Sequence, residues 1–222
     1  MTAHIERINI PLTSPLIIAA LLFSTAACSN PSAVSTSNNK STTTESKEIS
    51  TSDNDTQTAT QTKTSKPAFT TKAIATFDEP WAMTALPIAD SKAPKLLVTQ
   101  KTGELFIVDT ATGNKTKIEG MPTVAYGGQG GLGDIIVAPD FATSNTVYLS
   151  YAEAGTGGDS NKFGAKVIKA ILSGLETATP ILQDITPIWQ QSPKVTGQGH
   201  YSHRLLFSPD GRYLYISSGE RQ

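Results

Sequence analysis

The sequence predicts an all-β protein whose N-terminal third is not part of the folded domain. From Pro67 onward, short apolar runs of strand length are separated by Gly, Pro, Asp and Asn. No long window has the periodicity of a helix. A weak internal repeat, in which a proline turn precedes an apolar run, accompanies these strands. Together the three observations favour a β-propeller over the alternative, a sandwich of similar hairpins.

The individual strands are bounded by turn residues on both sides, and most alternate or run continuously in Val, Ile, Leu and Tyr. The predicted strands are residues 95–100, 104–110, 134–139, 146–152, 165–172, 204–209 and 213–218.

The repeat sets the size of one structural unit. Its marker prolines, Pro87, Pro139 and Pro209, lie roughly 50 to 70 residues apart, which suits one four-stranded blade with its loops. Residues 67–222 therefore have room for about three blades, whereas propellers close with about four to eight. The sequence also stops directly after a predicted strand. We expect residues 67–222 to be the partial, N-terminal portion of a larger propeller.

Residues 1–28 have the pattern of a bacterial lipoprotein signal. A polar start is followed by the apolar run LIIAALLF at 16–23 and by STAAC, which ends at Cys28, the only cysteine. An apolar run this short suits a cleaved signal and not a membrane-spanning helix. We expect Cys28 to become the lipidated first residue of an exported protein of the periplasm or cell envelope, anchored at the outer membrane.

Two other interpretations of this cysteine stay open. Cys28 could follow an ordinary signal cleaved after Ala27, or it could be a chance loop cysteine. Thr25 departs from the lipobox pattern, which usually has leucine at that position.

Residues 29–66 are rich in Ser, Thr, Asn and Gln and contain no aromatic residue. Such a segment buries too little apolar surface to fold, so we expect a flexible linker that holds the domain on the order of 30 to 40 Å from its anchor. An O-glycosylated stalk is the alternative. The net charge of −1 and the absence of a basic patch argue against nucleic acid as a partner.

Residues 127–134, GGQGGLGD, match the glycine spacing of the dinucleotide-binding fingerprint. That fingerprint needs a helix after it, and here a predicted strand and a proline turn follow, so we reject the nicotinamide interpretation. Two interpretations of the glycines remain. They let backbone approach a flat ligand beside the donor and acceptor of Gln129, or they form a tight turn between blades.

Residues 199–204, GHYSHR, contain both His200 and His203, while the third histidine, His4, lies in the predicted signal. The pair could supply two metal ligands, but a third ligand is lacking and strand geometry would point the rings to opposite faces. They could be ordinary polar loop residues. A neutral imidazole could also act as a general base toward the hydroxyl of a sugar or alcohol.

Strand alternation separates the side chains of this segment into two sets. It places His200, Ser202 and Arg204 on one side and Tyr201 and His203 on the other. Only one histidine can therefore face a given site.

Six motifs occur in an order and spacing that point to one family: PWAMTALP (80–87), LLVTQKTGELFIVD (96–109), GQGGLGDIIVAPDF (128–141), NTVYLSYAE (145–153), GHYSHRLLFSPDG (199–211) and ISSGER (216–221). With them the chain, from about Phe77 onward, resembles the N-terminal half of the soluble quinoprotein glucose dehydrogenases and aldose sugar dehydrogenases, the glucose/sorbosone dehydrogenase family. The resemblance implies a six-bladed β-propeller that carries pyrroloquinoline quinone (PQQ) and oxidises aldoses to lactones, passing electrons to an external acceptor.

The resemblance also implies roles for individual residues. His200 matches the histidine that takes the proton of the anomeric hydroxyl while hydride passes to the quinone, and His203 is its neighbour. Gln129 matches a glutamine beside the quinone and substrate. Arg204 matches an arginine that we expect to be structural.

The chain departs from the family pattern at three positions. Ser202 and His203 replace a pair of small residues, which could narrow or polarise the pocket. Gly199 stands where some glucose dehydrogenases have an acidic partner for the base, so the sequence leaves open how His200 would be tuned as a base.

The resemblance places the rest of the cofactor site later than residue 222. This holds for the cations that bind the quinone carboxylates and for most ligands of the family's calcium ions. We expect no metal site within residues 1–222 and no dehydrogenase activity from these residues alone.

The rival hypothesis is a non-catalytic propeller that binds glycans or a protein partner. A hydrolase is a more distant third, because the sequence shows no nucleophile paired with a base and no paired carboxylates.

Overall fold

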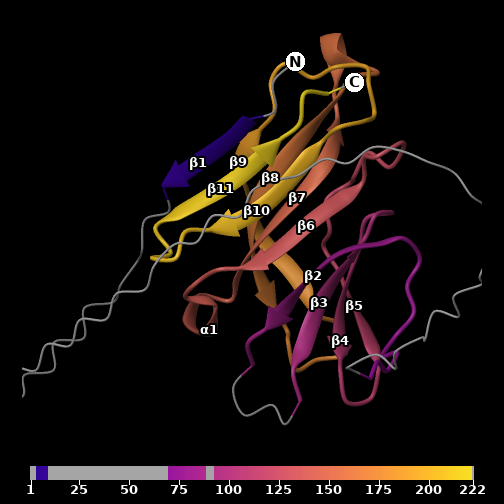
Figure 1. The fold of residues 1–222 in the computed structure, drawn as a ribbon, viewed down its shortest axis with the longest axis vertical. Helices are drawn as coiled ribbons and strands as arrows, with labels where there is room; N and C mark the ends of the chain where they lie inside the picture. Colours follow the sequence, from indigo (N-terminus) through magenta and orange to yellow (C-terminus); the bar gives the residue numbers. More distant parts are fainter. Residues whose placement is uncertain (1–3, 10–69, 89–92, 222) are drawn as a thin grey trace, which may run out of the picture. The chain divides into compact units, whose positions relative to one another are not determined.

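A computed structural model describes residues 4–9, 70–88 and 93–221 (Figure 1). The described chain consists of two four-stranded sheets and one three-stranded sheet, all antiparallel, so the predicted all-β, propeller-type fold is confirmed. Helical structure is limited to α1 (Phe141–Ser144) and a 3₁₀ turn (Gly157–Asp159). In these described ranges no helix has the length and apolar character needed to cross a membrane.

The first sheet is a meander in the order β2-β3-β4-β5. Its strands are β2 (Pro80–Leu86), β3 (Lys95–Gln100), β4 (Glu104–Asp109) and β5 (Lys115–Ile118). Asp109 closes the turn after β4, because its carboxylate accepts the backbone N–H groups of Ala111 and Thr112. The same hydrogen bonds, led by the one from Thr112, lower the pKa of Asp109.

The second sheet repeats this meander in the order β6-β7-β8-β9. Its strands are β6 (Leu132–Val137), β7 (Thr146–Ala154), β8 (Phe163–Ser173) and β9 (Ile181–Gln190). The single turn of α1 ends at Asn145, which adopts a left-handed conformation (φ 50°) and donates its N–H to the carbonyl of Phe141. Asn tolerates this conformation better than most residues do.

The third sheet has the order β1-β11-β10. Its strands are β1 (His4–Asn9), β10 (Ser202–Phe207) and β11 (Tyr213–Ser218). Strand β1 falls inside the predicted signal and pairs antiparallel with β11, where the Arg7 guanidinium lies 4.5 Å from the Tyr213 ring centroid. Residues 10–28, with Cys28, and the predicted linker 29–66 lie outside the described residues.

The proline repeat marks equivalent positions in the three sheets. Pro87, Pro139 and Pro209 follow β2, β6 and β10, each in the connection to the next strand of its sheet, which is β3, β7 or β11. The interpretation of the repeat as one blade per unit is therefore confirmed.

The second sheet is buried on both faces, and β7 shows this along its length. Val147 and Leu149 pack in a cluster with Leu97 and Leu105 of the first sheet. Between them, Tyr148 faces the opposite side and packs with Leu214 of the third sheet. Alternate side chains of a strand point to opposite faces, so one strand serves two cores. A two-layer sandwich has no such central sheet, and that alternative is wrong.

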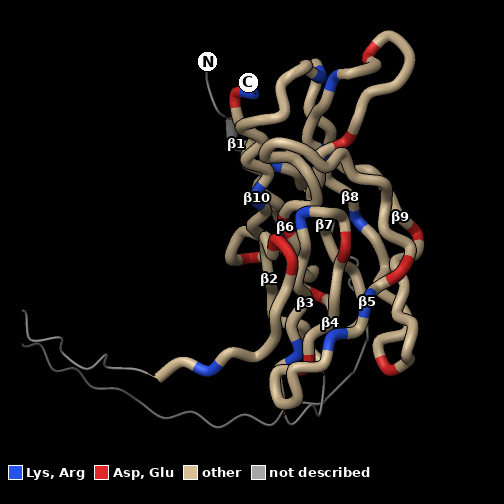
Figure 2. Tube along the Cα trace, turned by 90° about the vertical axis from the view of Figure 1, so that its right-hand side faces the viewer, with Lys and Arg blue, Asp and Glu red and all other residues tan. Residues whose placement is uncertain are grey.

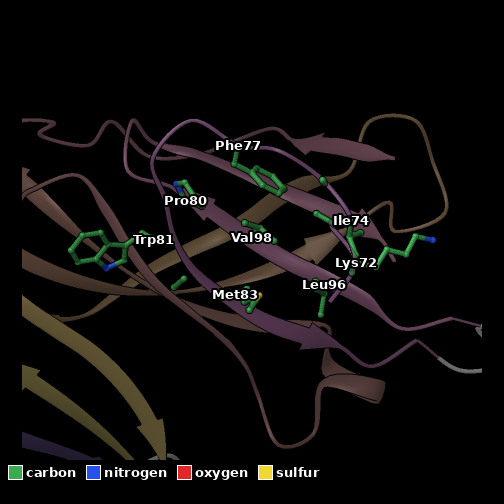
Figure 3. Close-up of a pocket in the computed structure, with 11 residues that line it drawn as sticks. Lys72, Ile74, Phe77, Pro80, Trp81, Met83, Leu96 and Val98 are labelled. Atoms are coloured by element: carbon green, nitrogen blue, oxygen red, sulfur yellow. The ribbon is translucent and has the colours of Figure 1, made fainter. Parts of the chain in front are cut away.

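The other face of the first sheet carries an apolar groove of about 390 Å³ (Figure 3). Leu96 and Val98 lie on this face of β3, opposite the face of Leu97, and Phe77 and Met83 join them. Met83 is 71% exposed. The groove ends at Trp81, whose indole also borders the pocket described next.

Candidate active site

A pocket of about 330 Å³ lies at the starts of β2, β6 and β10. It is lined by Trp81, Gln129, Gly219, Glu220 and residues 200–203. Trp81 belongs to β2, Gln129 precedes β6, and His200 precedes β10, so all three sheets contribute to the lining. The pocket thus brings together His200 and Gln129, two residues that the sequence assigned to the site.

Glu220 is the direct partner of His200. Antiparallel pairing of β10 with β11 sets Ser202 opposite Ser218, and the chain continues two residues further on each side to bring the Glu220 carboxylate onto Nδ1 of His200. This hydrogen bond is the main cause of a lowered pKa for Glu220, which is therefore ionised at neutral pH. An ionised carboxylate only accepts, so Nδ1 carries the proton and Nε2 is left as the proton acceptor.

The sequence left the tuning of His200 open because Gly199, beside the histidine in sequence, carries no carboxylate. In the structure a carboxylate reaches His200 from the end of the next strand. The hairpin register of RLLFSPDGRYLYISSGE contained the signal, because two paired strands bring residues before the first strand close to residues after the second.

Gln129 contacts the backbone of His200. Its Oε1 accepts the N–H of His200 at 2.8 Å, and its own N–H donates to the carbonyl of Gln198 at 2.8 Å. These two bonds hold the segment before β6 against the segment before β10. Gln129 therefore fixes where His200 sits and remains part of the pocket wall.

The glycines around Gln129 permit close packing of the protein on itself. A Cβ on Gly131 would lie 2.1 Å from the carbonyl oxygen of Lys101, and one on Gly133 would lie 2.0 Å from Cε1 of His203. Gly128 has φ +55°, a conformation that suits glycine, and lies against Gln198. Strand β6 follows directly, so a helix N-terminus for a dinucleotide phosphate is not formed here.

The backbone of residues 200–203 is left-handed at three positions. The φ angles are 49° for His200, 59° for Ser202 and 43° for His203. Left-handed conformations of this kind cost about 1–3 kcal/mol each in non-glycine residues. The burial pattern still follows the predicted alternation, with Tyr201 and His203 buried and Ser202 and Arg204 exposed.

His203 is buried and differs completely from His200 in environment. Its Nδ1 lies 2.8 Å from Oγ of Ser150, and burial, with smaller effects of Arg221 and Arg204, lowers its pKa to about 4. His203 is therefore neutral at pH 7. The metal-ligand interpretation gains no support, because over the described ranges no three His, Cys, Asp or Glu side chains gather in a group that could hold an ion.

The Ser150–His203 contact also bears on the hydrolase hypothesis. Ser150 is fully buried, and its hydroxyl donates to the carbonyl of His203 at 2.7 Å. A serine whose proton is held by a carbonyl and whose oxygen does not reach solvent cannot act as a nucleophile. This pair is part of the protein interior.

Arg204 lies outside the pocket lining. Its Nε is 3.0 Å from Oδ2 of the buried Asp134, and its backbone N–H donates to Oγ of Ser217 at 2.9 Å. Asp134 also accepts the N–H of Leu205 at 2.8 Å, so these contacts fasten β10 to β6.

Arg221 fixes the loop before the base and was not assigned a role from the sequence. Its guanidinium donates to the carbonyls of Gly199 at 2.8 Å and Gly197 at 2.6 Å. It also lies over the ring of Tyr201, with Cζ 3.3 Å from the ring centroid, a cation–π arrangement. The motif ISSGER does not predict this role of Arg221, because the carbonyls that accept its hydrogen bonds lie more than twenty residues earlier in the chain.

Ion pairs also hold the loop between β9 and β10, which leads to His200. Basic and acidic residues are interspersed along the described chain (Figure 2), and Glu153 accepts from both Lys166 and Lys194 at 2.5 Å. The Lys194 side chain is only 8% exposed. These partly buried ion pairs tie the loop that leads to His200, through Lys194, to Glu153 of β7 and thereby to Lys166 of β8.

Comparison with known proteins places these features in one family. The family model for glucose/sorbosone dehydrogenases matches residues 77–222. The aldose sugar dehydrogenase YliI of Escherichia coli (strain K12) is 38% identical over 144 residues, which cover 64% of this chain and 36% of that protein.

Solved structures show the same likeness. The apo form of the soluble aldose sugar dehydrogenase from E. coli has a TM-score of 0.55 at 37% identity, covering 64% of this chain and 38% of that one. The PQQ-bound aldose sugar dehydrogenase from Streptomyces coelicolor has a TM-score of 0.55 at 26% identity, covering 68% and 41%. This chain therefore spans well under half the length of these relatives, and it belongs to the glucose/sorbosone dehydrogenase family.

Proposed function

We propose that the full-length protein containing this chain is a PQQ-dependent aldose dehydrogenase that oxidises the anomeric hydroxyl of a sugar to a lactone. The observation that carries the proposal is the His200–Glu220 pair in a pocket shared with Gln129. An imidazole with an ionised carboxylate on Nδ1 and a lone pair on Nε2 is the arrangement expected of a general base.

Each of these side chains has a definable task. Nε2 of His200 takes the hydroxyl proton of the sugar, and the Glu220 carboxylate stabilises the imidazolium that forms. Gln129 holds the backbone N–H of His200, which fixes the direction of Nε2. When bound, the quinone supplies the two-electron acceptor that no side chain provides.

The pocket fits part of the quinone. Trp81 offers an aromatic surface and Gln129 offers an amide, which together suit a flat ring system with polar edges. Lys and Arg are missing from the residues that line this pocket in the described structure. The cations that hold the quinone carboxylates, and the calcium ligands, are therefore proposed to come from the part of the protein that follows this chain.

We extend the proposal to residues 1–222 expressed alone, which we expect to be inactive. The apolar groove beside Trp81 supports this, because a face with Met83 and Phe77 at its surface resembles the side of a blade that packs on another blade (Figure 3).

Export as a lipoprotein also remains a proposal. It predicts that the mature protein begins at Cys28 and partitions into detergent, and that Cys28→Ala abolishes the partitioning. Cleavage there would remove β1 and leave the outer edge of β11 free for a following strand.

The proposal is tested by expressing the full-length mature protein and titrating it with PQQ and calcium while dye reduction is followed with several aldoses. Sugar-dependent reduction that requires PQQ is the expected result. Absence of PQQ binding would overturn the proposal and favour the non-catalytic binding propeller.

A further inference from the structure

The left-handed backbone at His203 needs an explanation, because residues with a Cβ avoid this conformation. His203 lies three residues after the base in a segment where His200 and Ser202 are left-handed as well. Such a segment keeps its conformation only if neighbouring groups hold it. The neighbours of His203 therefore affect where His200 stands.

Ser150 is the group that holds His203. Its Oγ donates to the carbonyl of His203 at 2.7 Å and lies 2.8 Å from Nδ1 of the same residue. It also accepts the N–H of Asp134 at 2.8 Å. The hydroxyl has one hydrogen, which is directed to the carbonyl, so Nδ1 of His203 must be the protonated nitrogen. One buried serine thus bonds both the backbone and the side chain of His203.

The same imidazole contacts the segment that carries Gln129. The ring of His203 packs on Gly133, where a Cβ would lie 2.0 Å from Cε1. Ser150, Gly133 and His203 are all buried, and they belong to β7, β6 and β10. Their contact joins the second sheet to the third sheet at the pocket, whose lining includes His203.

We propose that the Ser150–His203 pair is a positioning device for His200. It holds the left-handed conformations of His200, Ser202 and His203 and thereby sets His200 against Glu220 and Gln129. The inference rests on the proposed function insofar as His200 is the base, but the geometry of the segment can be measured without any catalysis.

The test compares variants of the full-length protein. Ser150→Ala removes the hydroxyl, and Ser173→Ala, on β8 of the same sheet, removes an exposed hydroxyl that bonds only Gln183. Ser150→Ala should lower kcat about tenfold and change the KM for sugar and the affinity for PQQ by less than about twofold, because binding groups stay in place. Ser173→Ala should match the wild type.

A second pair of variants isolates the backbone conformation. Both variants lose the hydrogen bond between Nδ1 of residue 203 and Oγ of Ser150. His203→Ala keeps a Cβ in the left-handed region, whereas His203→Gly adopts φ 43° readily. We expect kcat to fall about tenfold for the alanine variant and about threefold or less for the glycine variant. Equal losses in the two would overturn the proposal, and this comparison remains decisive if Ser150→Ala fails to fold.

A readout without PQQ separates this inference from the proposed function. In the apo protein, reaction of His200 with diethyl pyrocarbonate, followed by mass spectrometry, should become several-fold slower in Ser150→Ala, since Nε2 is a weaker nucleophile once Glu220 no longer accepts the Nδ1–H. Slower labelling in a protein that oxidises no sugar would leave the positioning device standing and refute the enzyme. Labelling and kcat equal to wild type, with only a lower Tm, would refute the positioning device.

Discussion

The carboxylate of Glu220 contacts Nδ1 of His200, twenty residues earlier in the chain, because β10 and β11 pair in the register that sets Ser202 opposite Ser218. The hairpin of β10 and β11 therefore also brings His200 and Glu220 together. Both strands are anchored by apolar residues, Leu205 on β10 and Leu214 and Ile216 on β11, so the register has little freedom to slip.

Glu220→Gln should lower kcat about 10- to 100-fold and leave the fold intact. The amide can still accept the Nδ1–H, but it cannot stabilise the imidazolium with a negative charge. Steady-state kinetics of the full-length protein measures the effect. Glu104→Gln is the matched control, since Glu104 pairs with Lys117 at the surface of the first sheet. An unchanged kcat in Glu220→Gln would show that the carboxylate has no part in the reaction.

The pH dependence of stability should carry a contribution from His203. Its folded pKa, about 4, lies below the ordinary value of 6.5, so between these values the unfolded chain binds a proton that the folded protein does not. The contribution of His203 to the free energy of unfolding is therefore fully present above about pH 6.5. It falls by on the order of 3 kcal/mol in total as the pH drops toward 4.

Denaturant unfolding at several pH values between 4.5 and 7.5 measures this slope. His203→Gln, which has no titrating group, should show a smaller dependence on pH than the wild type. Identical slopes would mean that His203 is not the buried neutral group described here.

Gly133→Ala should reduce both stability and activity. The new Cβ would lie 2.0 Å from His203, and overpacking of this kind costs about 1–3 kcal/mol. The displaced ring should also disturb the segment that carries His200. Gly158→Ala is a suitable control, because nothing lies within 4 Å of its Cβ position. Thermal unfolding and kcat of the two variants give the comparison, and equal behaviour would contradict the packing.

Leu149→Ala tests the core between the first two sheets. Leu149 is fully buried on β7, so its truncation should lower the free energy of unfolding by about 2–5 kcal/mol. Leu206→Ala removes a side chain of the same size that is 67% exposed on β10. It should change the free energy of unfolding by less than about 0.5 kcal/mol. Similar losses for both would be inconsistent with the described sheet packing.

All seven predicted strands fall within two residues of strands in the structure, namely β3, β4, β6, β7, β8, β10 and β11. The strands that were not predicted, β1, β2, β5 and β9, all lie at sheet edges. Of these, β5 is KTKI, and β9 is mostly exposed and contains Pro187. Edge strands tolerate both polar residues and proline, so their sequences lack the pattern.

The candidate site was also predicted only in part. Resemblance to a family proposed His200 and Gln129 as site residues, and the structure shows which groups these two residues contact. Glu220, Arg221 and Ser150 could not be assigned from local sequence, because each acts on a segment that is distant in the chain. Their roles depend on strand register and on which groups become buried.

If His200 is the general base of a sugar dehydrogenase, kcat of His200→Ala in the full-length protein loaded with PQQ should fall about 10²- to 10⁴-fold, with PQQ affinity and Tm close to wild type. A variant that oxidises aldoses at the wild-type rate would contradict this role of His200.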